Sequence, residues 1–135
     1  MTIRDIMESV KQKRNLTLSD AHCVRCLSEL DSKIYEDIIL RHAGKEQYML
    51  RAADGSVSDR PFPYKSDASR LIAPERFFGM YEAYLMCEAD YALDEIGRYR
   101  NDLLLFERAY NGFAAWYNET HLPAHGARIT AVREW

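Results

Sequence analysis

The residues best suited to chemistry in this sequence are two closely spaced cysteines, Cys23 and Cys26. Such a pair can act in redox exchange or supply two of the four ligands of a zinc ion. A redox pair normally opens a helix after a β-strand, whereas this pair lies inside a predicted amphipathic helix. His22 precedes the pair, but His42 lies about five helical turns away, out of reach of a shared ion. We predict that Cys23 packs in the core, that Cys26 is partly exposed, and that the chain holds no metal and no cofactor.

Acidic side chains recur along the predicted helices, and Glu88 interrupts an apolar stripe between Tyr84 and Tyr91. A di-metal helical bundle would place Glu-x-x-His motifs on paired helices, and the sequence contains none. A carboxylate that faces a core needs a partner, and Arg98 or Arg100 beyond the next turn is the expected one. The pattern favours a structural ion pair over a catalytic acid.

The remaining residues do not indicate an enzyme. The four histidines are scattered, and no grouping of serine, cysteine and histidine suggests an activated nucleophile. The six glycines are isolated, so no glycine-rich loop is present to cradle a phosphate. We therefore expect a protein without catalytic residues.

Composition and charge are typical of a single globular domain over residues 1–135, which are 47% hydrophobic and 29% charged. A net charge of −3 does not favour a nucleic-acid binder. No signal peptide or membrane span is expected, and three cysteines give no closed disulfide framework, so we expect a cytosolic origin. Bases gather in residues 1–18 and acids in residues 75–120. This asymmetry predicts either a charged face exposed to solvent or opposite charges that attract a neighbouring copy of the chain.

The first part of the helical body is predicted over about residues 3–43. A short helix near residues 3–11 begins after Thr2, a good N-cap. A longer helix over residues 19–43 follows, because apolar residues recur there every three or four positions. Gly44 lies just past its predicted end, where a C-terminal glycine belongs.

The second part of the helical body is predicted over about residues 75–120, with Pro74 at its entrance. One unbroken helix over this span would be about 69 Å long at 1.5 Å per residue, which is too long for one small domain. We therefore predict a break near residues 92–94, with Asp94 as the N-cap of the last helix. The last two helices then form an antiparallel hairpin.

Between these parts, residues 45–73 are irregular. Asp54-Gly55, flanked by short apolar runs, predicts a small β-hairpin. The fold class is therefore mostly α: a small bundle of three or four main helices, with a long irregular loop or small β-hairpin around residues 45–73. A C-terminal tail occupies residues 121–135.

The last helix carries an aromatic stripe, whose members are spaced alternately by four and three: Tyr99, Leu103, Phe106, Tyr110, Phe113 and Tyr117. Residues at this spacing lie on one face of a helix, so the stripe predicts the seam along which the helix packs. Trp116 is adjacent to Tyr117 and points about 100° away from it, so these rings cannot all share one narrow seam. We expect the surplus rings to lie at a protein interface.

Two stretches together resemble a family of small tailed-phage proteins. "CLSELDSKIYEDII" at residues 26–39 is similar to the family's Leu-Ser-Glu-Leu-Asp-x-x-Ile signature. Residues 71–123, which close on "WYNETHLP", are similar to the family's C-terminal half. These proteins come from phages and prophages of Gram-positive bacteria and are generally taken to be head–tail connector, or neck adaptor, proteins.

This chain departs from the family pattern at a few positions. Cys26 stands where an aromatic residue usually precedes the signature, and Ser32 replaces the glycine that usually follows it. Leu93-Asp94 stands where the family usually carries Asn-Gly. These differences bear mainly on the geometry of turns.

The resemblance implies a structural protein of the virion neck, assembled in the cytoplasm of the bacterial host. Such adaptors form a ring under the portal protein, join the capsid to the tail, and contact neighbouring copies and the next neck or tail protein. DNA contact in the lumen would at most be non-specific, and no membrane is involved. The irregular segment 45–73 and the tail are the expected contact arms.

Interface candidates are the large apolar and aromatic side chains on these segments, and they are Tyr64, Leu71, Ile72, Phe77, Phe78, Trp116, Tyr117, His121 and Trp135. The alternative function is a small helical protein-binding or regulatory module of a bacterium. A connector would form rings or bind a portal, whereas a regulator would be a stable monomer or dimer.

Overall fold

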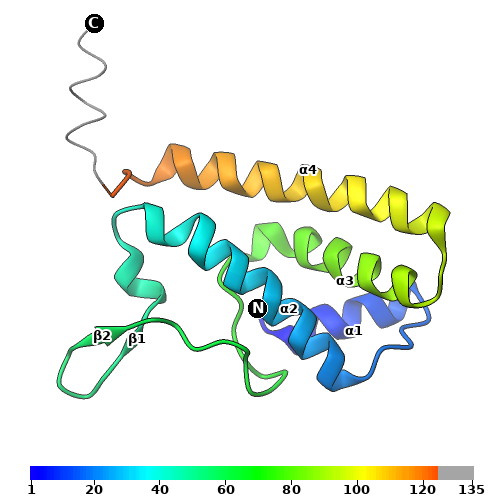
Figure 1. Cartoon of the computed structure of the whole chain (residues 1–135), viewed down its shortest axis with the longest axis horizontal. Coiled ribbons are helices and arrows are strands. Elements are labelled where there is room, and N and C mark those ends of the chain that lie inside the picture. Colours follow the sequence, from blue (N-terminus) through cyan, green and yellow to red (C-terminus); the bar gives the residue numbers. More distant parts are fainter. Residues whose placement is uncertain (125–135) are drawn as a thin grey trace, which may run out of the picture.

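Four helices carry most of residues 1–124, the part of the chain that the computed structural model describes (Figure 1). They are α1 (Ile3–Lys13), α2 (Asp20–Asp37), α3 (Phe78–Ala92) and α4 (Ile96–Thr120). The central helix is α3, which packs against each of the other three, while α4 packs mainly on α3. This arrangement confirms the predicted mostly α bundle and its final antiparallel hairpin. None of the helices within residues 1–124 is both long and apolar enough to cross a bilayer.

The short helix α1 begins where the sequence predicts. The Asp5 backbone amide donates to the Thr2 hydroxyl at 3.3 Å, and the Thr2 amide donates to the Asp5 carboxylate at 2.9 Å. This capping box satisfies backbone donors that a helix start leaves unpaired. A helix of 11 residues is marginal alone, so packing of its apolar face stabilises it, and that face comprises Ile3, Ile6, Met7 and Val10.

The second helix is shorter than predicted, because α2 ends at Asp37 and not near residue 43. The chain then tightens into a 3-10 turn, η1 (Ile39–Arg41). Both Ile38 and Ile39 are buried at this turn, and a ring nitrogen of His42 lies 2.6 Å from the Ile38 carbonyl oxygen. A side chain thus satisfies a carbonyl that a continued helix would have bonded to a backbone amide.

The predicted β-hairpin is confirmed. After a second 3-10 turn, η2 (Lys45–Tyr48), strand β1 (Leu50–Arg51) pairs antiparallel with β2 (Val57–Ser58). Gly55 lies between the strands with a φ of 87°, a left-handed conformation that favours glycine. In Figure 1 this hairpin projects at one end of the molecule, and the turn between α3 and α4 lies at the other end.

Residues 59–73, by contrast, return along the bundle. The Arg4 backbone amide donates to the Asp67 carbonyl oxygen at 2.8 Å, and the two side chains form an ion pair at 2.8 Å. The Leu71 amide donates to the Met1 carbonyl oxygen at 3.2 Å. This part of the predicted contact arm is therefore fastened to its own N-terminus, and only the β1–β2 hairpin is left to project.

The aromatic stripe of α4 does face the bundle, but its burial is graded. Phe113 and Tyr117 are fully buried, whereas Phe106 is half-buried with its ring centroid 5.1 Å from that of Tyr84. The stripe is thus confirmed as a packing seam toward the C-terminal end of α4. Toward its N-terminal end the seam opens, and large side chains reach the surface.

Candidate protein-interaction site

A group of exposed apolar side chains lies at the turn between α3 and α4. Tyr91 is 72% exposed, Ile96 57% and Leu93 47%. Tyr99 is half-buried beside them, with its ring centroid 5.8 Å from that of Tyr91. We call these four side chains the tip patch. The sequence stripe placed Tyr91 toward the core, but α3 ends one residue later, and within residues 1–124 the Tyr91 ring remains largely exposed.

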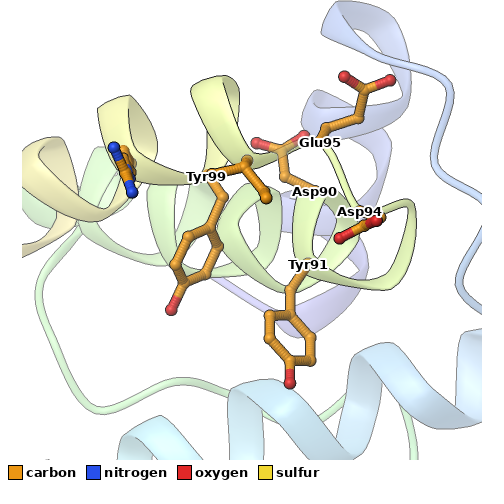
Figure 2. A pocket seen from close by; sticks show the side chains of 7 residues that line it. Asp90, Tyr91, Asp94, Glu95 and Tyr99 are labelled. Carbon is orange, nitrogen blue, oxygen red and sulfur yellow. The ribbon is translucent and has the colours of Figure 1, made fainter.

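Three members of the tip patch, Tyr91, Ile96 and Tyr99, line a pocket of about 330 Å³. Figure 2 shows the rings of Tyr91 and Tyr99 pointing to one side of the turn, while the carboxylates of Asp90 and Glu95 point to the other. Arg100 completes the lining. An apolar centre with a charged rim is typical of surfaces that bind another protein.

The turn itself has an unusual backbone. Asp94 has a φ of 57°, in the left-handed region that is costly for residues with a Cβ. The Glu95 amide donates to the Asp90 carbonyl oxygen at 2.9 Å, and the Asp94 amide to that of Tyr91 at 3.1 Å. Glu95, and not Asp94, occupies the N-cap position, without a side-chain cap bond. The predicted capping role of Asp94 is therefore wrong, because its backbone turns the chain instead.

Replacing Asp94 with glycine is expected to raise the free energy of unfolding by about 0.5–1 kcal/mol, since glycine adopts a positive φ without steric cost. Urea unfolding followed by circular dichroism measures the change, with Asp94→Ala as the control that keeps the Cβ and gains nothing. Lower stability in Asp94→Gly would show that the aspartate side chain stabilises the turn by more than its backbone costs.

Beneath the tip patch, Arg14 ties the end of α1 to both helices of the hairpin. Its Nη1 donates to Asp90 at 2.6 Å and also to Asp102, and its Nη2 donates to Asp102 at 3.2 Å. Both carboxylates are buried. Burial, followed by the neighbouring Asp102, raises the pKa of Asp90 above its ordinary value. One guanidinium thus bridges two buried acids and sets how the α3–α4 turn sits on α1.

The basic N-terminal segment and the acidic hairpin therefore pair within one chain. Besides the Arg14 cluster, Lys13 lies 2.8 Å from the carboxylate of Glu82, which also accepts a hydrogen bond from Ser9. These ion pairs within the chain engage part of the charge asymmetry seen in the sequence. Fewer of these charges are therefore left to attract a neighbouring copy.

Three of the predicted interface residues lie in the core of the chain itself. Leu71 and Ile72 are covered by the bundle, and Tyr117 is 1% exposed. His42 and His121 pack against the Tyr117 ring, with His121 stacked flat at a centroid distance of 3.7 Å. These three candidates are corrected to core residues, because a partner cannot reach them while the chain is folded.

Four others are half-buried and shared between core and surface: Phe77, Phe78, Trp116 and His121. The centroid of the Phe77 ring lies 5.0 Å from that of Phe113 and 5.2 Å from that of Trp116. The Arg76 guanidinium lies over the rings of Phe77 and Trp116. These residues retain an exposed edge that a partner can contact. Trp135 lies outside the described residues.

Tyr64 is an internal anchor. Its hydroxyl donates to one carboxylate oxygen of Asp31 at 2.6 Å, and the Ile72 amide donates to the same oxygen at 3.0 Å. The Tyr81 hydroxyl donates to the other oxygen. Burial raises the pKa of Asp31, and the hydrogen bonds from Tyr64 and Tyr81 oppose that rise. The aspartate of the Leu-Ser-Glu-Leu-Asp stretch thus holds segment 59–73 onto α2 and α3.

Both cysteines of the pair are buried in the core of the bundle. Cys23 is buried in the core as predicted, but Cys26 is only 3% exposed, which corrects the expectation that it is partly exposed. Both thiols are free. Burial, with smaller contributions from Glu88 and Glu29, raises the pKa of Cys26 to about 12.

Glu88 does not form the ion pair with Arg98 or Arg100 that was predicted from the sequence. No ion pair or hydrogen bond to its carboxylate occurs within residues 1–124. The carboxylate instead faces α2, where its oxygen, the Cys26 sulfur and a ring nitrogen of His22 all lie within 4.8 Å of one another. Burial and the charge of Glu29 raise the pKa of Glu88. The prediction of an ion pair with Arg98 or Arg100 is wrong, since those residues follow the turn on another helix.

No family model matches the chain, and the comparisons with curated proteins and with solved structures also find no match. Its function therefore has to be inferred from its own surfaces and contacts.

Proposed function

We propose that this chain is a head–tail connector subunit of a tailed phage, which acts through protein contacts in the virion neck and not through catalysis. The observation that carries the proposal is the tip patch, where large apolar side chains remain exposed around the turn of the α3–α4 hairpin. Apolar surface of this kind is stabilised when another protein covers it, at about 25 cal/mol per Å² removed from water. The resemblance of residues 26–39 and 71–123 to phage neck adaptors supports the same conclusion.

The arrangement of exposed surfaces suits a ring. The tip patch lies at one end of the molecule, and the β1–β2 hairpin, with Leu50 52% exposed, lies at the other (Figure 1). A contact between two different surfaces of neighbouring copies is heterologous, and it closes into a ring when the rotation per subunit is right. In this proposal a neighbouring copy covers the tip patch.

The other partners follow from the place of a connector in the neck. The portal protein binds one face of the ring, and the next neck or tail protein binds the other. A net charge of −3 suits a lumen through which DNA passes without being held, because tight binding of DNA depends on neutralising phosphates with lysine and arginine.

The test measures the solution mass of the protein by light scattering, alone and with the portal ring of the same phage. We expect a defined ring or capture on the portal. The double variant Tyr91→Gln/Ile96→Gln is expected to stay monomeric while its free energy of unfolding changes by about 0.5 kcal/mol or less, since both side chains are exposed. The matched control is Leu104→Gln/Leu105→Gln, which changes two side chains of α4 that are each 56% exposed.

The outcomes separate the proposals. Loss of assembly in the tip variant but not in the control supports a connector that uses the tip patch. Loss in the control alone moves the interface to the middle of α4. A wild-type monomer or dimer that ignores the portal would overturn the connector and favour the small helical protein-binding module.

A further inference from the structure

We propose that His22, Cys26 and Glu88 form a zinc-binding site that joins α2 to α3. The three side chains offer an imidazole nitrogen, a thiolate sulfur and a carboxylate oxygen, which are the three donor types that zinc binds in proteins. Their ligand atoms all lie within 4.8 Å of one another. This inference does not depend on the connector function.

The local geometry follows from helix periodicity. His22 and Cys26 are four positions apart, so they lie one above the other on the same face of α2. Glu88 reaches that face from α3. Zinc bonds of about 2.0–2.3 Å place tetrahedral ligands roughly 3.3–3.7 Å apart. The ligand atoms therefore need to approach one another by at most about 1–1.5 Å, which side-chain rotations provide.

The candidate ligands are not engaged elsewhere. Within residues 1–124, none of the three side chains makes a hydrogen bond or an ion pair. A half-buried carboxylate without a partner is costly, and a bound cation would offset that cost. Cys23, in contrast, is fully buried in the apolar core and is not part of the cluster.

The donor set selects the metal. Calcium and magnesium take oxygen ligands and gain little from a thiol, whereas a mixed sulfur, nitrogen and oxygen set suits zinc. Binding replaces the proton on the Cys26 sulfur by a sulfur–zinc bond and releases that proton to solvent. Three protein ligands leave one position of the tetrahedron for water. Bound zinc would pin the N-terminal half of α2 to α3.

Cobalt(II) is the spectroscopic probe for this site. Titration of the full-length, metal-free protein with cobalt is expected to give a thiolate-to-cobalt charge-transfer band and visible absorption of tetrahedral intensity, saturating at one ion per chain. Zinc is expected to displace cobalt and bleach both bands. Zinc at about 100 times its Kd is expected to raise Tm by about 5–10 °C.

Variants decide the assignment. Cys26→Ser is expected to abolish the charge-transfer band, and His22→Ala and Glu88→Gln to raise the Kd for cobalt about 100-fold or more. The matched controls are Cys87→Ser, which changes a buried free thiol outside the cluster, and His121→Ala. Cys26→Ser also changes a buried position and can affect folding, so its effect on cobalt binding is compared with that of His22→Ala. Absence of the charge-transfer band in the wild type, or cobalt binding unchanged in His22→Ala and Glu88→Gln, would overturn the proposal.

Discussion

Asp31→Ala is expected to lower the free energy of unfolding by about 3–5 kcal/mol. The Asp31 carboxylate is fully buried and accepts hydrogen bonds from the hydroxyls of Tyr64 and Tyr81 and from the amide of Ile72. Its removal leaves three donors without an acceptor in a place that water does not reach. Each orphaned donor costs about 1–3 kcal/mol, and the costs add only in part because the loop can relax.

Circular dichroism during guanidinium unfolding measures this loss. Asp37→Ala, an exposed acid near the end of the same helix, is the control and should change stability by about 0.5 kcal/mol or less. Trypsin should also cleave the Asp31→Ala variant faster after Lys65, because Asp31 no longer holds the segment that contains this exposed lysine.

Asp31→Asn makes the test sharper. The amide retains the shape of the carboxyl group but turns one acceptor into a donor, so a loss of about 1.5–3 kcal/mol is expected if Asp31 is ionised in the folded protein. An Asn variant as stable as the wild type would contradict this role. It would show that the buried group is protonated and acts through its shape and one hydrogen-bond donor.

The second large effect is expected at Arg14. Arg14→Met is expected to destabilise the chain by about 3–5 kcal/mol near neutral pH, because it leaves Asp90 and Asp102 buried and without a cation. The methionine fills much of the space of the arginine stem, so the loss reports the charges more than a cavity. The control is Lys11→Met. Lys11 lies 3.7 Å from Asp20 in an exposed pair, so its replacement should cost about 1 kcal/mol or less.

The pH dependence of this loss follows from the two acids. The pKa of Asp90 is already raised by burial and by Asp102, so the folded state binds this proton more tightly than the unfolded state does. The stability that this group contributes is therefore present at low pH and falls as pH rises through the raised pKa. Arg14 opposes this rise in the pKa of Asp90, so without Arg14 the Asp90 carboxyl should hold its proton more tightly still. The loss in Arg14→Met is thus expected to be smaller at about pH 5 than at pH 7. A loss that does not change with pH would contradict the charge explanation.

Removing one acid from the Arg14 variant provides a further check. Asp90→Asn combined with Arg14→Met is expected to be more stable than Arg14→Met alone, because one of the two unpaired charges is gone. If the second substitution adds its own loss instead, the destabilisation comes from lost packing around Arg14.

Local features of this chain were determined by the sequence alone. The start of α1 after Thr2, the β-hairpin around Gly55 and the break before α4 were all predicted, because capping, turn chemistry and hydrophobic period depend on residues a few positions apart. The end of α2 was predicted too late, since the turn after Asp37 is stabilised by burial of Ile38 and Ile39, which only the folded bundle provides.

The functional surfaces, in contrast, were decided by tertiary structure. Arg14 meets partners 76 and 88 positions away, and Glu88 joins His22 and Cys26 from another helix. Hydrophobic period identifies the apolar face of a helix, but it does not say how much of that face a neighbour covers or which charges meet across helices. For that reason the sequence placed Tyr117 at an interface, whereas packing of α4 on α3 buries it. The sequence likewise placed Tyr91 toward the core, whereas the structure leaves it exposed at the tip.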